Sequence, residues 1–177
     1  MSGAGKSYCI DYLKAKNILL VYFGGIVVDE TIRRYGKTDE EHEKIVREGM
    51  RTIDGKDAIA KKILTQIDQL ISQGETKLLA DGLYSWTEYK LFKEHWSDNA
   101  IIIAVVAPRN LRHQRLENRP IRPLTEEEVT AREYAEIENI EKGGPIANVD
   151  YTILNKDTPV KMLAQLDKTL EELQIIL

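Results

Sequence analysis

The sequence contains a single cysteine, Cys9, among its 177 residues. One cysteine can neither close an internal disulfide nor assemble a cysteine-based metal cage. The chain must therefore be stabilised by its core and its hydrogen bonds. Because this composition is typical of proteins in a reducing compartment, we expect a cytoplasmic location.

The sequence also has no excess of basic over acidic residues. The chain has 25 Lys and Arg against 29 Asp and Glu, which gives a formal net charge of −4, and the two signs are interspersed. Nucleic-acid binding proteins usually present a basic stripe or patch. We therefore expect no nucleic-acid partner.

Long apolar runs are absent as well. The longest, such as residues 100–107, are far shorter than the ~20 residues that a membrane-spanning helix requires, so we expect no membrane association. A chain of this length with 42% hydrophobic residues can bury one substantial core but is short for two domains. We expect a single domain over residues 1–177.

Short apolar runs alternate with segments of helical spacing. Runs without polar alternation are typical of parallel strands covered on both faces, and they occur at residues 18–23, 77–80, 100–106 and, more weakly, 151–154. Helical spacing is found at residues 6–16, 27–35, 39–52, 57–72, 86–95, 111–119, 126–142 and 160–173. This alternation predicts an α/β layer fold with right-handed crossovers.

The helix expected over residues 126–142 has signals at both ends. Thr125 can cap its start and Glu128 can close a capping box, while residues 143–145 (Gly-Gly-Pro) are expected to stop it. The preceding segment, residues 118–124, is basic, rich in proline and poorly suited to helix. We expect an irregular loop there.

The clearest chemical motif lies at the N-terminus. Residues 2–7 read Ser-Gly-Ala-Gly-Lys-Ser and match the end of the phosphate-loop (Walker A) pattern G-x-x-x-x-G-K-[ST]. In this pattern backbone N–H groups surround phosphate oxygens, the lysine reaches the β- and γ-phosphates, and the hydroxyl serves Mg²⁺. The predicted ATP-binding residues are Ser2, Gly3, Ala4, Gly5, Lys6 and Ser7, with Ser7 also holding Mg²⁺. The alternative is a flexible glycine-rich tail, but the Gly-Lys-Ser triplet opens directly into a helix.

Two parts of the full pattern fall outside this sequence. The first glycine would lie one residue before Met1, and no apolar strand precedes the loop. We expect the natural protein to carry roughly ten further residues that end in glycine, because this architecture places that strand at the centre of the sheet. Otherwise another segment or a partner chain must fill the gap.

Less specific motifs follow the phosphate loop along the rest of the chain. They are residues 22–29 (Tyr-Phe-Gly-Gly-Ile-Val-Val-Asp), 81–82 (Asp-Gly), 115–119 (Arg-Leu-Glu-Asn-Arg), 138–147 and 150–155. With the loop, they make the chain resemble the P-loop nucleotide kinases, particularly the dephospho-CoA kinase-like and adenylate kinase-like proteins. The resemblance implies a three-layer P-loop NTPase fold with parallel strands in the order 2-3-1-4-5, the first strand missing here. It also implies an acceptor-side helical excursion at residues 36–74 and a lid at residues 118–124.

The resemblance also implies roles for three arginines. Arg115 would stack on the donor adenine, and Arg119 would reach the donor phosphates. Their spacing of four predicts that both point from one helix face into a shared site. Arg132, on the helix after the lid, would close over the transferring group. The competing interpretation pairs these arginines with acidic residues on a solvated surface, namely Glu117, Glu126 or Glu128.

Asp81 follows an apolar run, where a parallel strand delivers its last side chain to the ligand edge of the sheet. A carboxylate there would hold Mg²⁺ or orient the acceptor hydroxyl; the alternative is a helix cap. Tyr84 and Trp86 would line an acceptor pocket or pack in the core. Related kinases place an arginine shortly after this Asp-Gly pair to bind the acceptor phosphate, and at Gly25 and Val28 they often carry Asp and Arg. These differences weaken the case for a plain nucleoside monophosphate.

The expected function is transfer of the ATP γ-phosphoryl group to a small molecule, with dephospho-CoA or a nucleoside monophosphate as acceptor. The expected cofactors are ATP and Mg²⁺. The predicted catalytic residues are Lys6, Asp81, Arg119 and Arg132. Two alternatives stay open: an ATP-binding switch that signals to a partner without productive transfer, and an α/β domain whose loop binds nothing.

Overall fold

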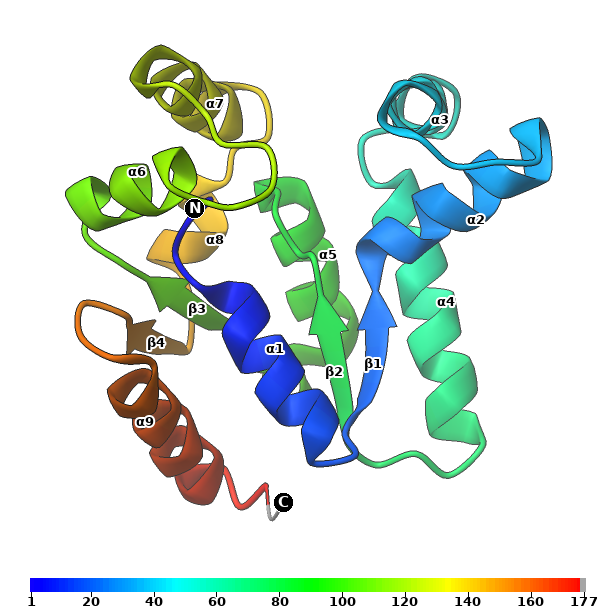
Figure 1. Ribbon diagram of the computed structural model, residues 1–177. Coiled ribbons are helices and arrows are strands. Elements are labelled where there is room, and N and C mark those ends of the chain that lie inside the picture. The colour runs from blue at the N-terminus through cyan, green and yellow to red at the C-terminus, as the bar shows by residue number, and fades with distance from the viewer. Residues whose placement is uncertain (176–177) are drawn as a thin grey trace. The chain divides into compact units, whose positions relative to one another are not determined.

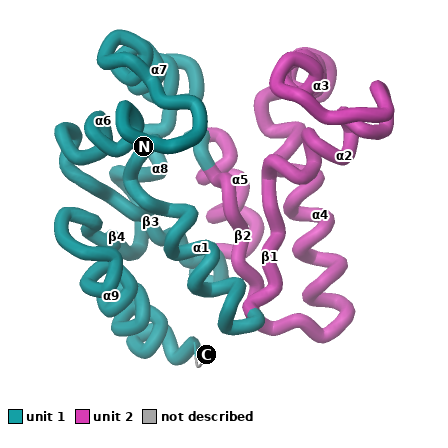
Figure 2. Tube along the Cα trace, viewed as in Figure 1, with its two compact units in different colours: residues 1–17, 84–86, 98–177 teal, residues 18–83, 87–97 magenta. Residues whose placement is uncertain are grey.

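A computed structural model describes residues 1–175 of the chain. The structure is a mixed α/β arrangement in which short parallel strands alternate with helices (Figure 1). The chain divides into two compact units (Figure 2): unit 1 comprises residues 1–17, 84–86 and 98–177, and unit 2 comprises residues 18–83 and 87–97. Each unit contains one pair of parallel strands.

Unit 2 is built on β1 (Leu19–Tyr22) and β2 (Leu78–Asp81), which pair in parallel from Leu19 opposite Leu78 to Tyr22 opposite Asp81. Its helices are α2 (Phe23–Tyr35), α3 (Glu40–Asp54), α4 (Ala58–Ser72) and most of α5 (Trp86–Trp96). Their apolar faces form one buried core, made of Val21, Phe23, Val27, Val46, Met50, Ile59, Ala60, Ile63, Leu64, Ile67 and Phe92. Burial of these side chains is the main favourable term for this unit.

Local signals set the helix ends in unit 2. Gly36 adopts the left-handed conformation with φ 70° and donates its N–H to the Ile32 carbonyl at 2.8 Å, which ends α2. The Asp39 carboxylate accepts a hydrogen bond from the His42 N–H at 3.0 Å and caps α3. The segment at residues 36–74 is therefore helical, as predicted, and consists of α3 and α4.

Unit 1 is built on β3 (Ile103–Val106) and β4 (Tyr151–Leu154), which pair in parallel from Ile103 opposite Tyr151 to Val106 opposite Leu154. A 3₁₀ turn at Ser97–Asn99 precedes β3. The helices of unit 1 are α1 (Lys6–Ala15), α6 (Arg109–Glu117), α7 (Glu126–Glu138), the short α8 (Gly143–Ala147) and α9 (Pro159–Glu172). Helix α9 packs on β4 and α1, and α6 packs on α7.

The two strand pairs are those expected from the order 2-3-1-4-5, in which the second and third strands are neighbours, as are the fourth and fifth. In this chain they are β1 with β2 and β3 with β4. The capping box at the start of α7 is also confirmed, with Glu128 N–H to Thr125 Oγ1 at 3.3 Å and Thr125 N–H to Glu128 Oε2 at 2.8 Å. Within residues 1–175, no helix has the length and apolarity to cross a bilayer.

Three predicted boundaries are wrong. Phe23 begins α2 instead of ending a strand, because its side chain is needed in the core of unit 2. Helix α7 ends at Glu138. Beyond it Glu141 is left-handed with φ 59°, and the Lys142 N–H bonds back to the Glu136 carbonyl at 3.1 Å. The Gly-Gly-Pro segment therefore does not stop α7, and begins α8 instead.

Helix α6 also ends earlier than predicted. It stops at Glu117, and the Asn118 N–H donates the last helical hydrogen bond, to the Gln114 carbonyl at 3.1 Å. Residues 118–125 are irregular, as the proline content predicted, and the Leu124 N–H bonds to the Leu116 carbonyl at 3.2 Å to close the loop. Arg119 therefore lies outside the helix that was expected to present it.

Candidate functional site

The segment at residues 2–7 forms a turn that leads directly into α1. Gly3 and Gly5 are left-handed, with φ values of 75° and 97°, and Gly5 is the N-cap of α1. In the part of the chain that the structure describes, no side chain caps this helix, and its first turn holds no acidic residue. Successive N–H groups in such a turn form an anion-binding concavity, which the helix dipole reinforces.

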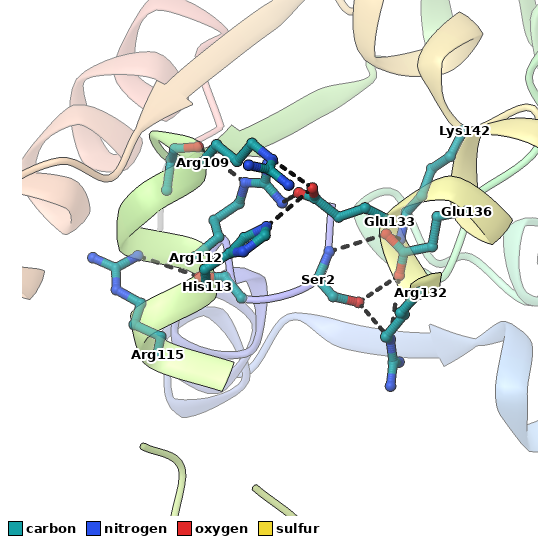
Figure 3. Close-up of polar contacts among 11 residues, drawn as sticks. Ser2, Arg109, Arg112, His113, Arg115, Arg132, Glu133, Glu136 and Lys142 are labelled. Atoms are coloured by element: carbon teal, nitrogen blue, oxygen red, sulfur yellow. Dashed lines mark hydrogen bonds and ion pairs between the residues drawn. The ribbon is translucent and has the colours of Figure 1, made fainter. Parts of the chain in front are cut away.

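Contacts from distant elements hold this loop in place. Asn155, buried directly after β4, donates from Nδ2 to the Ala4 carbonyl at 2.9 Å. Arg115 of α6 donates to the Gly3 carbonyl at 3.3 Å (Figure 3). It also donates to Asn155 Oδ1 at 3.3 Å. The loop is thus supported from β4 and α6 together, with Arg115 in contact with the Gly3 backbone. The adenine-stacking role that the resemblance implied for Arg115 stays a prediction.

Both glycines are required by close contacts as well as by conformation. A Cβ on Gly3 would lie 2.7 Å from the Arg112 carbonyl oxygen, and a Cβ on Gly5 would lie 2.3 Å from Asn155 Nδ2. Left-handed φ values add a cost of roughly 1 kcal/mol for most other residues. The loop can therefore reach this position only with glycine at these two places.

A buried carboxylate lies at the start of the loop. Glu136 of α7 accepts hydrogen bonds from the Ser2 N–H at 3.1 Å and from the Ser2 hydroxyl. Lys142 Nζ lies 3.2 Å from Glu136 Oε2, and Arg132 Nε lies 3.6 Å from Oε1 and donates to Ser2 Oγ at 3.1 Å (Figure 3). Burial raises the pKa of Glu136, but the Ser2 hydrogen bonds and the Lys142 charge outweigh it, so the pKa lies below its ordinary value. The carboxylate is therefore ionised at neutral pH.

A second buried carboxylate joins α7 to α6. Glu133 lies 2.9 Å from Arg109 Nε and 3.0 Å from His113 Nε2, and it pairs with Arg112 Nη1 (Figure 3). Burial raises the pKa of Glu133, but the interactions with His113, Arg109 and Arg112 together lower it to about 2. The ion pairs fix α7, which carries Glu136, against the helix that carries Arg115.

Two lysines lie near one aromatic ring. The Nζ atoms of Lys142 and Lys6 are 4.5 Å and 5.9 Å from the ring centroid of Tyr84. Burial lowers the pKa of Lys142 more strongly than the charge of Glu136 raises it. An open hollow of about 280 Å³ is lined by residues that lie close to Tyr84 or Lys142 in the sequence. They are Trp86, Ile137, Glu141, Gly143 and Gly144.

The structure separates the predicted arginines. Arg119 Nε donates to the Arg122 carbonyl within its own loop, so the prediction that Arg115 and Arg119 share a helix face is wrong: α6 ends two residues before Arg119. Arg132 is brought to the loop, where it contacts Ser2 and Glu136. Arg132 therefore contacts the start of the loop, and not Glu117, Glu126 or Glu128 as the competing interpretation held.

Asp81 is the last residue of β2 and is buried, which confirms the prediction that it ends a strand. Gly82 follows with φ 118°, where a Cβ would lie 2.8 Å from Phe23 Cβ. Asp81 belongs to unit 2, whereas Ser7, exposed in the first turn of α1, belongs to unit 1. No three His, Cys, Asp or Glu side chains among residues 1–175 form a metal-binding group, and the magnesium roles of Ser7 and Asp81 remain predictions.

Sequence reasoning missed four residues of this site. Asn155 had a signal, since it follows an apolar strand as Asp81 does. Glu133 and Glu136 continue a helical face that starts at the buried Val129, at spacings of four and seven, where an apolar side chain is the usual choice. Lys142 had no signal, because the left-handed turn that places it contains no glycine at Glu141.

Comparisons with known proteins agree on one family. No protein-family model matches the chain. The UPF0200 protein of Thermococcus kodakarensis is 29% identical over 176 residues, which cover 98% of this chain and 94% of that protein. The UPF0200 protein of Thermococcus gammatolerans is 30% identical over 158 residues, covering 88% and 82%. Among solved structures, TT1252 from Thermus thermophilus has a similar fold, with a TM-score of 0.60 and 19% identity over 97% of this chain and 93% of that one. The chain belongs to the UPF0200 family.

Proposed function

We propose that this protein is a P-loop enzyme that binds ATP with Mg²⁺ on residues 2–7 and transfers the γ-phosphoryl group to a small molecule. The backbone of the loop carries the proposal. Gly3 and Gly5 are left-handed, no described side chain caps α1, and Lys6 is the first residue of that helix. An uncapped helix start after a glycine turn is suited to phosphate oxygens.

The residues around the loop fit such a ligand. ATP supplies the phosphoryl group, and Mg²⁺ neutralises charge on its β- and γ-oxygens. Lys6 would pair with those oxygens, and the exposed Ser7 hydroxyl would ligate the metal. Arg132, 51% exposed and already in contact with Ser2, would stabilise the transferring group. Arg115 and Asn155 would keep the loop in its binding shape.

The acceptor side of the proposal uses the end of β2. Asp81 would orient the acceptor hydroxyl or hold Mg²⁺ through water. Gly82 has no side chain because Phe23 packs against its backbone, and this contact fixes the turn that follows Asp81. Arg119 would reach the donor phosphates only after leaving the Arg122 carbonyl, as a loop closing over ATP requires. Dephospho-CoA and nucleoside monophosphates are the first acceptors to test.

One observation supports a second proposal, an ATP-binding switch without productive transfer. Tyr84 stands shortly after Asp81-Gly82, where related kinases place an arginine for the acceptor phosphate. If nothing replaces that arginine, ATP binding would change the loop without an acceptor in place. Glu136 and Arg132 both contact Ser2, so they would carry the change from the loop into α7.

Isothermal titration of the Lys6→Ala variant with ATP and Mg²⁺ tests the donor site. We expect no measurable binding, because Lys6 serves ligand oxygens. The matched control is Lys14→Ala, an exposed lysine on the same helix, which should bind ATP as the parent protein does. Parent-like binding by Lys6→Ala would show that residues 2–7 are not the donor site.

ADP release with an acceptor panel separates the two proposals. Release that depends on dephospho-CoA or on a nucleoside monophosphate supports the kinase. ATP binding with no acceptor-dependent release supports the switch. If the parent protein does neither, both proposals fall.

A further inference from the structure

The two lysines near Tyr84 form a cationic group that the donor loop alone does not explain. Lys6 belongs to the loop, whereas Lys142 comes from the turn after α7, yet its Nζ is the nearer to the ring centroid, at 4.5 Å against 5.9 Å. An ammonium ion is attracted to the face of an aromatic ring. Two ammonium ions near one ring repel each other, and an oxyanion placed among them would relieve that repulsion.

The position of Lys142 is fixed by its surroundings. Its backbone N–H bonds to the Glu136 carbonyl at 3.1 Å, and its ammonium lies 3.2 Å from the carboxylate of the same residue. Its side chain is only 13% exposed. Glu141, immediately before it, is held at φ 59°, a conformation that is unfavourable for most non-glycine residues. A lysine positioned at this cost presents its charge to a defined place.

A hollow lined by residues on either side of Lys142 in the sequence offers a flat apolar wall and one acceptor group. Trp86 lies two residues after Tyr84, and Glu141, Gly143 and Gly144 flank Lys142 in sequence. The Gly144 backbone touches the indole, since a Cβ there would lie 2.9 Å from the ring, whereas a Cβ on Gly143 would meet nothing within 4 Å. With about 280 Å³, the hollow has room for one planar ring and not for a large cofactor.

We propose that Lys142 and Trp86 form the acceptor subsite, in which Lys142 binds an oxyanion of the acceptor and Trp86 stacks on the planar ring that carries it. The inference rests on the proposed kinase function. Lys142 replaces, from another element, the arginine that related kinases carry near Tyr84. An ammonium is a point charge, so the subsite tolerates phosphate or carboxylate, whereas a guanidinium fork selects bidentate partners. Glu141 accepts hydrogen bonds from N–H groups of the ring.

Glu136 neutralises Lys142 while the subsite is free. Its carboxylate also bonds to Ser2 in the donor loop, so one residue connects the donor loop to the acceptor lysine. The Lys142 side chain is largely buried, so bulk water screens its interaction with a bound anion only a little. In this proposal Lys142 binds the acceptor, and without a ligand it stays paired with Glu136.

Tryptophan fluorescence reads this subsite directly. The chain has two tryptophans, so Trp96→Phe leaves Trp86 as the only reporter. Titrations use the four common nucleoside 5′-monophosphates, the matching nucleosides, and nicotinate as a carboxylate on a planar ring. We expect at least one oxyanion-bearing ring to quench Trp86. Quenching by monophosphates identifies phosphate as the group, and quenching by nicotinate identifies carboxylate.

The Lys142→Gln variant in this background tests the charge. Affinity for the oxyanion ligand should fall roughly ten- to a hundredfold, while affinity for the uncharged nucleoside should stay the same. Lys142→Arg should retain most of the binding, and Lys168→Gln, an exposed lysine on α9, should change nothing. A lysine with only a structural role would not separate charged from uncharged ligands. Absence of quenching by every ligand, or equal affinity in Lys142→Gln and parent, overturns the proposal.

The ADP-release assay distinguishes this inference from the function on which it rests. If Trp86 reports Lys142-dependent binding but no acceptor stimulates ADP release, the subsite stands and the kinase proposal falls. If an acceptor stimulates ADP release equally in the parent and in Lys142→Gln, the kinase stands and the subsite is wrong.

Discussion

Replacing Glu133 with glutamine removes a negative charge on α7 that pairs with three basic residues of α6. The side chain is 7% exposed and faces Arg109, Arg112 and His113. Glutamine keeps the shape and can accept one hydrogen bond, but it leaves the buried guanidinium of Arg112 without a counter-charge. Breaking a buried pair by removing one partner typically costs about 3 to 5 kcal/mol.

The pKa of Glu133 gives a second estimate of how much stability the Glu133→Gln variant loses. Burial raises it, and the three basic partners lower it from 4.5 to about 2. At about 1.4 kcal/mol for each pKa unit, ionised Glu133 contributes about 3 kcal/mol at neutral pH. Because the folded-state pKa is depressed, this contribution is fully present above pH 4.5 and is lost as the pH falls from 4.5 towards 2.

Urea unfolding measures the effect. Near neutral pH, Glu133→Gln should lower the midpoint by roughly 1.5 to 2.5 M, given an m-value of about 2 kcal/mol/M. Near pH 3 the difference in unfolding free energy between parent and variant should be clearly smaller, because the parent has begun to lose the contribution of this carboxylate. The control is Glu138→Gln, an exposed residue on the same helix, which should shift the midpoint little.

Two results would refute this reasoning. Equal midpoints for Glu133→Gln and the parent near neutral pH would show that the ion pairs are screened by solvent. A difference that stays constant from neutral pH to about pH 3 would show that the variant acts through packing and not through charge.

Further predictions concern the loop, the thiol and the strand end. Gly3→Ala should weaken ATP binding measured by calorimetry, because the new Cβ meets the Arg112 carbonyl at 2.7 Å, while Gly49→Ala, with nothing within 4 Å, should not. Burial raises the pKa of Cys9 to about 11, so iodoacetamide near pH 8 should alkylate it only in urea, as intact mass would show. Asp81→Asn should lower turnover with an identified acceptor more than ATP affinity; unchanged turnover would leave Asp81 with a structural role.

Much of the fold follows from local sequence. The apolar runs at residues 18–23, 77–80, 100–106 and 151–154 each contain a strand of the structure, because continuous apolar runs of this length pack between helix layers. Capping chemistry predicted the start of α7 at Thr125. The end of the same helix was not predictable, since it depends on a left-handed Glu141 that only the surrounding contacts make tolerable.

The candidate site was predictable only where its chemistry is contiguous. The Gly-Lys-Ser triplet matches a contiguous pattern, so the proposal for residues 2–7 could be made from the sequence alone. Asn155 contacts Ala4 across 151 positions, and Glu136 contacts Ser2 across 134. In a helix rich in glutamate, the local sequence does not indicate which carboxylates will be buried. Arg119 shows the opposite error, since its spacing from Arg115 was read as helical although the helix ends between them.

Helix α7 has an inverted pattern that connects the fold to the site. Glu133 and Glu136 are buried, while the large apolar residues Tyr134 and Ile137 are 57% and 51% exposed. Burying an ionised carboxylate is costly unless cations and hydrogen-bond donors surround it, and both carboxylates here have them. A spacing of three places both on one helix face, so Glu133 holds α6 while Glu136 holds Ser2. An apolar face could hold α6 equally well, but it could not bond to the loop. The burial of Glu136 is therefore explained by the loop that α7 supports, whereas Glu133 pairs with the basic residues of α6.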